Sequence, residues 1–147
     1  MRHYLVILMF CFFSSSVWAD GYQQELNEFF ALFEAGKKSE SIDRLYQTNP
    51  WVSQAADDII KVKTQLASLD SMVGKYLGKE LIHTNNVKNR FVQVTYLALY
   101  ERQPVRLEFQ FYKPKETWIV YAFSFDTDFD SDVKSVSRAQ AANGSGL

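Results

Sequence analysis

The spacing of apolar residues changes once along the chain, and this change constrains the fold more than any other feature. Up to Val73 the apolar residues recur every three or four positions, the period of a helix with one buried face. Over residues 105–112 apolar and polar residues alternate, the period of a strand with one buried face. The sequence therefore predicts an α+β domain in which helices precede a sheet.

The helical half of the chain divides into two or three helices. Residues 22–36 carry one apolar stripe and end at a glycine, which is typical of helix C-caps. A shorter helix starts near Ser39 and ends at Asn49-Pro50, because proline cannot continue a helix. A longer pattern runs from Ile59 to about Val73 in steps of three and four residues. That pattern is too short for a coiled coil, so we expect it to pack against the sheet.

Four strands follow the helices and form an antiparallel meander. Short turns after Tyr100 and around Pro114 require antiparallel neighbours, since parallel strands need long crossovers. We also expect a turn at Asn85-Asn86. The predicted strands span residues 79–84, 91–100, 105–112 and 117–128.

Two of these strands, over residues 91–100 and 117–125, have apolar residues on both faces. Strands of this kind need cover on both faces, and the predicted helices can cover only one. We therefore expect the other face to curl, to be closed by a loop, or to be buried against a second copy of the chain. The third arrangement would be a homodimer through the sheet face.

The first 19 residues have the pattern of a secretory signal. A basic start at Arg2 is followed by an apolar run over residues 4–13 and by small residues that end at Ala19. We expect cleavage between Ala19 and Asp20, and hence an exported protein that is periplasmic or secreted. An uncleaved anchor is the alternative, although ten apolar residues are short against the roughly 20 that cross a bilayer. Once cleaved, the chain has no predicted membrane span.

Cleavage would leave a chain with little reactive chemistry. The one cysteine of the sequence, Cys11, lies in the leader, so the mature chain has no disulfide, no thiolate nucleophile and no Cys-based metal site. Its one histidine is His83. The charge is near neutral and the isoelectric point is about 6.1, which argues against a nucleic-acid surface. We expect no cofactor, and we assign no catalytic residue and no metal ligand.

The mature chain is expected to form one domain over residues 20–132. From residue 133 onward it is rich in Ser, Ala and Gly, which predicts a flexible C-terminal tail over residues 133–147.

Five aromatic residues in or beside the predicted strands are the candidate ligand-binding or interface residues. Aromatic walls with hydroxyl groups suit a small apolar ligand. Core packing and dimer contact explain the same residues, because pleated, half-buried surfaces favour aromatic side chains. The five are Tyr96, Tyr100, Tyr112, Trp118 and Tyr121.

Two polar features are better explained by structure than by chemistry. His83 stands alone, without a cysteine or a recognisable triad order, which favours an ordinary strand residue. It is separated by strand parity from Glu80. Alternate carboxylates from Asp126 to Asp132 suggest a calcium loop, but the loop template requires Gly where Ser131 stands and Glu where Ser137 stands.

The order of elements resembles the NTF2-like (cystatin-like α+β) superfamily, in particular its small exported bacterial domains of unknown function. The resemblance rests on the residues 29–37, 42–46, 73–76 and 118–123 and covers about residues 22–130. It implies a curved sheet wrapped round the helices as a cone, an apolar pocket at the open end, and dimers through the sheet. Members with isomerase or hydratase activity carry acidic, Tyr or His residues in that pocket.

The sequence favours an exported, non-catalytic accessory or binding module, acting on a small apolar ligand or on an exported protein partner. The alternative is a small pocket enzyme of the isomerase or hydratase type, which would use a buried carboxylate or tyrosine as general acid or base. A third hypothesis is an inhibitor or immunity-type protein, which fits the size of the chain and its predicted export.

Overall fold

The computed structural model describes residues 21–52 and 56–144, so the predicted leader and its Ala19–Asp20 cleavage site lie outside the described residues. The helices are α1 (Gly21–Glu34), α2 (Lys38–Tyr46), α3 (Ala56–Val73) and α4 (Phe129–Gly144); the strands are β1 (Tyr76–Val87), β2 (Phe91–Tyr100), β3 (Val105–Tyr112) and β4 (Ile119–Asp126). Within the described ranges, no helix is both long and apolar enough to cross a bilayer.

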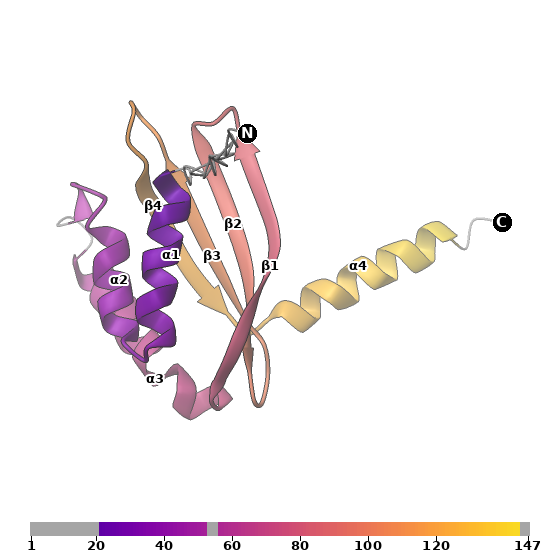
Figure 1. Ribbon diagram of the computed structural model, residues 1–147. Coiled ribbons are helices and arrows are strands. Elements are labelled where there is room, and N and C mark those ends of the chain that lie inside the picture. Colours follow the sequence, from indigo (N-terminus) through magenta and orange to yellow (C-terminus); the bar gives the residue numbers. More distant parts are fainter. Residues whose placement is uncertain (1–20, 53–55, 145–147) are drawn as a thin grey trace, which may run out of the picture.

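The four strands form one antiparallel sheet in the order β1-β2-β3-β4, which confirms the α+β class and the predicted meander. Figure 1 shows α1 and α2 on one face of this twisted sheet, with α4 projecting away from it. We call the face under the helices the core face and the opposite one the outer face.

Aromatic side chains of α1 form the centre of the core. The helical period of α1 brings Phe29, Phe30 and Phe33 to one side, where they meet the core face of β2 and β3. The ring centroids of Phe29 and Phe109 lie 4.9 Å apart in an edge-to-face arrangement. Helix α2 packs against both α1 and α3, and its Ile42 is fully buried between them. Truncation of such buried aromatic residues typically costs about 3–5 kcal/mol, so this layer fixes the position of α1 over the sheet.

The predicted turn at Asn85-Asn86 is wrong. Strand β1 continues to Val87, which lies opposite Phe91, and the chain reverses at Lys88 and Asn89. Both turn residues have positive φ, 51° and 53°, as in the tight turns that suit the twist of a hairpin. Cross-strand pairing along β2 sets this register and overrides the local turn preference of the two asparagines.

Helix α4 is absent from the sequence-based prediction, which ended the domain at residue 132. The helix runs across that position, and acidic residues occupy its first turn, where they complement the helix dipole. The last strand is also shorter than predicted, covering residues 119–126 rather than 117–128.

Candidate functional site

The five predicted aromatic residues do not form one site. Tyr96 and Tyr100 lie on the core face of β2, and Tyr100 is buried there. Trp118 is buried between the hairpin of β3 and β4 and the start of α1, edge-on to Tyr22 at 5.2 Å. The two remaining tyrosines are exposed and lie outside the core.

Tyr112 belongs to the outer face of β3, as its pairing with Phe91 and Ile119 shows. Tyr121 lies at a register shift in β4 and meets Phe91 edge-to-face, with ring centroids 5.6 Å apart. The structure therefore divides the predicted set between the core and the opposite surface. Trp118 and Tyr121 each line a separate cleft, and Tyr96 lines the cleft between α1 and the strands β1 and β2.

This cleft, which we call the α1–β1 cleft, has a volume of about 200 Å³. It exists because the helices cover β2, β3 and β4 but leave most of β1 exposed, so that α1 forms a step above the sheet. Its floor comes from β1 and β2 and its wall from the first two turns of α1. The lining residues are Tyr22, Gln23, Leu26, Asn27, Leu81, Thr84, Val94 and Tyr96.

The chemistry of the cleft is that of a binding surface. Its lining side chains are apolar groups, amides, one threonine and two phenols, and none is a carboxylate, histidine or lysine. Burial raises the pKa of Tyr96, and the neighbouring Tyr22 hydroxyl raises it further. A phenol with a raised pKa stays protonated, so Tyr96 is a hydrogen-bond donor rather than a base.

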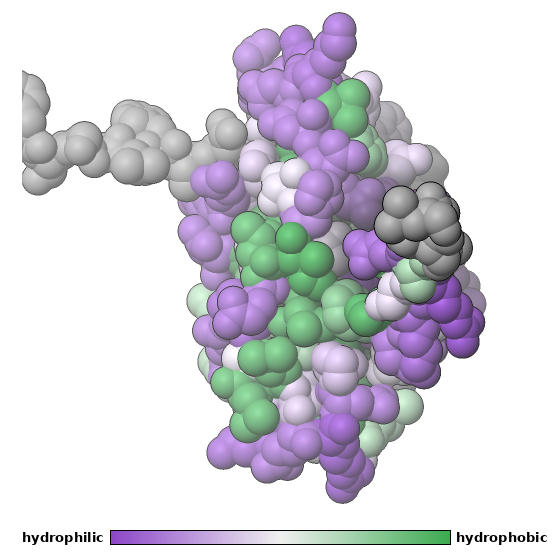
Figure 2. Space-filling view, turned by 90° about the vertical axis from the view of Figure 1, so that its right-hand side faces the viewer, coloured by the Kyte–Doolittle hydropathy of each residue, from purple (hydrophilic) through white to green (hydrophobic). Residues whose placement is uncertain are grey.

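Strand β1 presents a row of exposed aliphatic side chains beside the cleft. Figure 2 shows hydrophobic residues gathered along the side of the molecule that carries β1, between hydrophilic zones. Clusters of this kind on a soluble domain mark contact surfaces more often than isolated exposed residues do. We call this set the β1 row: Leu77 (62% exposed), Leu81 (56%) and Ile82 (43%).

The two edge strands of the sheet, β4 and β1, differ in whether side chains form hydrogen bonds with their backbones. On β4, the amide of Val120 donates to Thr48 Oγ1 at 2.9 Å, and Asn49 Nδ2 donates to the Val120 carbonyl oxygen at 2.9 Å. Along the free edge of β1, no described side chain forms a hydrogen bond of this kind with the backbone. An uncovered edge strand exposes donors and acceptors that another extended chain can pair with.

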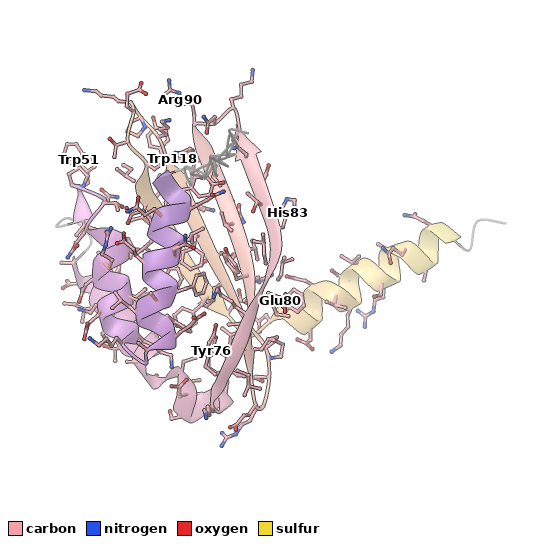
Figure 3. All side chains as sticks on the ribbon, viewed as in Figure 1. Trp51, Tyr76, Glu80, His83, Arg90 and Trp118 are labelled. Carbon is pink, nitrogen blue, oxygen red and sulfur yellow. The ribbon has the colours of Figure 1, made fainter. Side chains whose placement is uncertain are left out.

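Glu80 and His83 lie on the same face of β1, which corrects the parity-based expectation. A register shift between Leu81 and His83 places Glu80 opposite Leu97 and His83 opposite Thr95, both on the outer face. Figure 3 shows the two side chains on the side of β1 away from the helices. A β-bulge adds one residue and so reverses the expected alternation beyond it.

The acidic segment from Asp126 to Asp132 pairs with cations of the chain. Arg106 donates to Asp126 through Nη2 at 2.8 Å and also contacts Asp132. Asp130 pairs with Lys134 at 2.7 Å, and this hydrogen bond and charge lower the pKa of Asp130. In the described part of the chain, no three His, Cys, Asp or Glu side chains gather in a manner suited to a metal ion.

A buried cluster around Lys38 was missed by the sequence analysis. The Lys38 side chain is 5% exposed, pairs with Asp70, and lies over the rings of Phe33 at 5.3 Å and Tyr100 at 5.9 Å. The Tyr100 hydroxyl is buried and has no hydrogen-bond partner among the described residues. In the sequence Lys38 stands beside Lys37 and Glu40, a pattern typical of a solvated helix start, so no local signal identifies it.

The chain matches no protein-family model, no curated protein and no solved structure.

Proposed function

We propose that the protein is an exported, non-catalytic binding module that holds an extended segment of a protein partner along β1. The supporting observation is the position of the β1 row, on an uncovered edge strand directly beside the α1–β1 cleft. Addition of a strand to an open sheet edge is a recurring mode of peptide recognition. Backbone pairing supplies affinity in this mode, and pockets for alternate side chains supply specificity.

The size of the cleft favours a side chain of a larger partner over a whole small ligand. Pockets that enclose a small molecule have volumes of roughly 300–1,000 Å³, whereas the α1–β1 cleft has about 200 Å³. An apolar or aromatic side chain of the bound segment would contact Leu26 and Val94, with the Tyr96 hydroxyl at its end. An inhibitor or immunity-type role is one form of this function, since such proteins also act by binding another protein.

The enzyme hypothesis has one supporting feature, the partly buried phenol of Tyr96. An isomerase or hydratase also needs a base, and the lining side chains of the cleft supply none. The binding function needs only shape and hydrogen-bond donors, so the cleft fits it better. We further propose an NTF2-like fold for the domain and a homodimer through the outer face as the second use of the sheet.

Selection from a library of random peptides displayed on phage tests the binding function on the chain from Asp20 to Leu147. We expect enriched peptides to lose at least tenfold in affinity against Leu81→Lys and Ile82→Lys. The matched controls Ile60→Lys and Met72→Lys alter equally exposed aliphatic residues of α3 and should change affinity less than twofold. Methylation of alternate backbone nitrogens of the peptide should also weaken binding if it pairs as a strand. Failure to enrich any peptide, or equal losses in all four variants, would overturn the proposal.

A further inference from the structure

Two of the three hairpins of the sheet, β1–β2 and β3–β4, end side by side at one tip of the molecule. The backbone amide of Lys113 donates to the Arg90 carbonyl oxygen at 2.8 Å, and Arg90 Nη1 donates to the Lys115 carbonyl oxygen at 2.6 Å. Figure 3 places Arg90 at this end of the sheet, beyond Trp118. The two turns are therefore held together, and we call residues 88–90 and 113–116 the hairpin tip.

The hairpin tip is basic. Its seven residues include four cations, Lys88, Arg90, Lys113 and Lys115, and one acidic residue, Glu116. None of the four cations forms an ion pair with a described residue, although eight cations elsewhere do. The chain as a whole has a formal charge of −1, so positive charge is concentrated at this end.

An apolar row borders the tip on the outer face. The strand register places Val87, Phe91, Tyr112 and Ile119 next to one another across all four strands. Val87 and Tyr112 are 51% and 41% exposed. Aliphatic and aromatic side chains that lie beside unpaired lysines are the composition of surfaces that bind at a membrane interface.

The first helix begins at the same end of the molecule. A Cβ atom placed on Gly21 would lie 3.3 Å from Trp118 Cδ1, and Gly21, Lys113 and Glu116 line one cleft. The twenty residues that precede Gly21, including the apolar run over residues 4–13, therefore join the domain at the hairpin tip.

We propose that the hairpin tip and its apolar row dock on the surface of an anionic phospholipid bilayer. The unpaired cations contact the anionic headgroups, and Val87 and Tyr112 enter the interface beside them. The β1 row and the α1–β1 cleft remain free in this orientation, so membrane docking is independent of the proposed peptide binding.

Vesicle flotation tests this proposal with the chain from Asp20 to Leu147, which keeps every described residue. We expect binding to vesicles that contain phosphatidylglycerol and none to vesicles of phosphatidylcholine alone. Each lysine near an anionic surface contributes roughly fivefold in affinity, so Lys88→Gln, Lys113→Gln and Lys115→Gln together should lower it about a hundredfold. The matched triple variant Lys61→Gln, Lys134→Gln and Arg138→Gln removes the same amount of charge away from the tip. It should change the affinity for anionic vesicles less than threefold.

A labelled cysteine tests insertion separately. The mature chain has no cysteine of its own, so Val87→Cys can carry an environment-sensitive fluorophore, with Ser135→Cys on α4 as the control. Anionic vesicles should shift the emission of the label at position 87 to the blue and leave that at position 135 unchanged. Equal effects of the two triple variants, or no binding to anionic vesicles, would overturn the proposal. Binding to an acidic peptide such as polyglutamate without binding to vesicles would also overturn it and identify a protein partner.

Discussion

Asn49 Nδ2 donates to the carbonyl oxygen of Val120 at 2.9 Å. A side chain from the segment after α2 therefore covers the backbone of the edge strand β4. The Thr48 hydroxyl accepts a hydrogen bond from the backbone amide of Val120. Together the side chains of Thr48 and Asn49 bond both the backbone amide and the carbonyl of Val120. The opposite edge, β1, has no equivalent cover among the described residues. This asymmetry leaves β1 as the edge at which a partner strand can add.

Removal of the cover on β4 should destabilise the domain modestly. Thr48→Val deletes the bonds of its hydroxyl to the Val120 amide and the Leu45 carbonyl oxygen, and Asn49→Leu deletes the bonds of its amide group to the Val120 carbonyl oxygen and the Trp51 amide. Each lost hydrogen bond typically costs about 1 kcal/mol. Thr64→Val is the matched control, because the Thr64 hydroxyl bonds its own exposed helix. Urea denaturation should show a larger loss of unfolding free energy in Thr48→Val and Asn49→Leu than in Thr64→Val. An equal loss in Thr64→Val would show that the side chains that cover β4 contribute nothing specific.

Gly74 should tolerate alanine less well than Gly36. Both glycines follow a helix and have positive φ, +89° and +78°, which costs an L-residue about 1–2 kcal/mol. A Cβ atom on Gly74 would also lie 2.9 Å from Glu101 Cβ, whereas one on Gly36 would meet nothing within 4 Å. Thermal or urea unfolding of Gly74→Ala and Gly36→Ala should therefore show the larger loss at Gly74, and the reverse order would contradict the close approach of Glu101 to the end of α3.

The buried Lys38–Asp70 pair should be more sensitive to loss of the acid than to loss of both charges. Asp70→Asn leaves a lysine that is 5% exposed without its counter-charge, which should cost about 2–3 kcal/mol because Asp70 itself is half exposed. Lys38→Met combined with Asp70→Asn keeps the packing against Phe33 and Tyr100 and should cost less than Asp70→Asn alone. Asp58→Asn, in the exposed pair with Lys61, should cost less than about 0.5 kcal/mol. Equal losses from Asp70→Asn and the double variant would show that the pair is not effectively buried.

The sequence predicted the elements whose signals are local and missed those that depend on pairing. The stripe of Phe29, Phe30 and Phe33 repeats with the helical period, and the alternation over residues 105–112 repeats with the strand period, so both elements were predicted correctly. The bulge near Ile82 and the turn at Lys88 depend on the register against β2, which no local pattern contains.

The candidate site was less predictable than the fold for a similar reason. Aromatic side chains suit a core, an interface and a pocket equally well, so the sequence grouped Tyr96 with Tyr112 although they lie on opposite faces of the sheet. The cleft itself arises because the helix layer does not extend over β1. This depends on how the helices and the sheet pack together, which no local sequence pattern contains. The burial of Lys38 likewise depends on α3 and β2, which are distant in sequence.

Alkaline pH should destabilise the domain through the buried Tyr100 and the partly buried Tyr76. Burial raises the pKa of Tyr100, and the charge of Asp70 adds to this effect; burial and then the charge of Glu34 raise the pKa of Tyr76. A group whose pKa is raised by folding contributes stability that is complete below its unfolded value, about 10 for tyrosine, and is lost as the pH rises above it. The free energy of unfolding should therefore fall above about pH 10. Tyr100→Phe should reduce this fall without a loss at pH 7, since the hydroxyl has no described partner; a loss of more than about 1 kcal/mol at pH 7 would reveal one.

Native mass spectrometry of the protein from its own host should give a chain that begins at Asp20. The reason is that the small residues up to Ala19 form a pattern that signal peptidases recognise. The ten-residue apolar run before them is also short for a permanent membrane span. The same spectrum reports the assembly state, and a dimer that Leu97→Lys on the outer face converts to a monomer would support pairing through the sheet. A chain that keeps residues 1–19 would contradict cleavage. Membrane association would then persist in the Lys88, Lys113 and Lys115 variant, because the retained apolar run over residues 4–13 would itself contribute to binding.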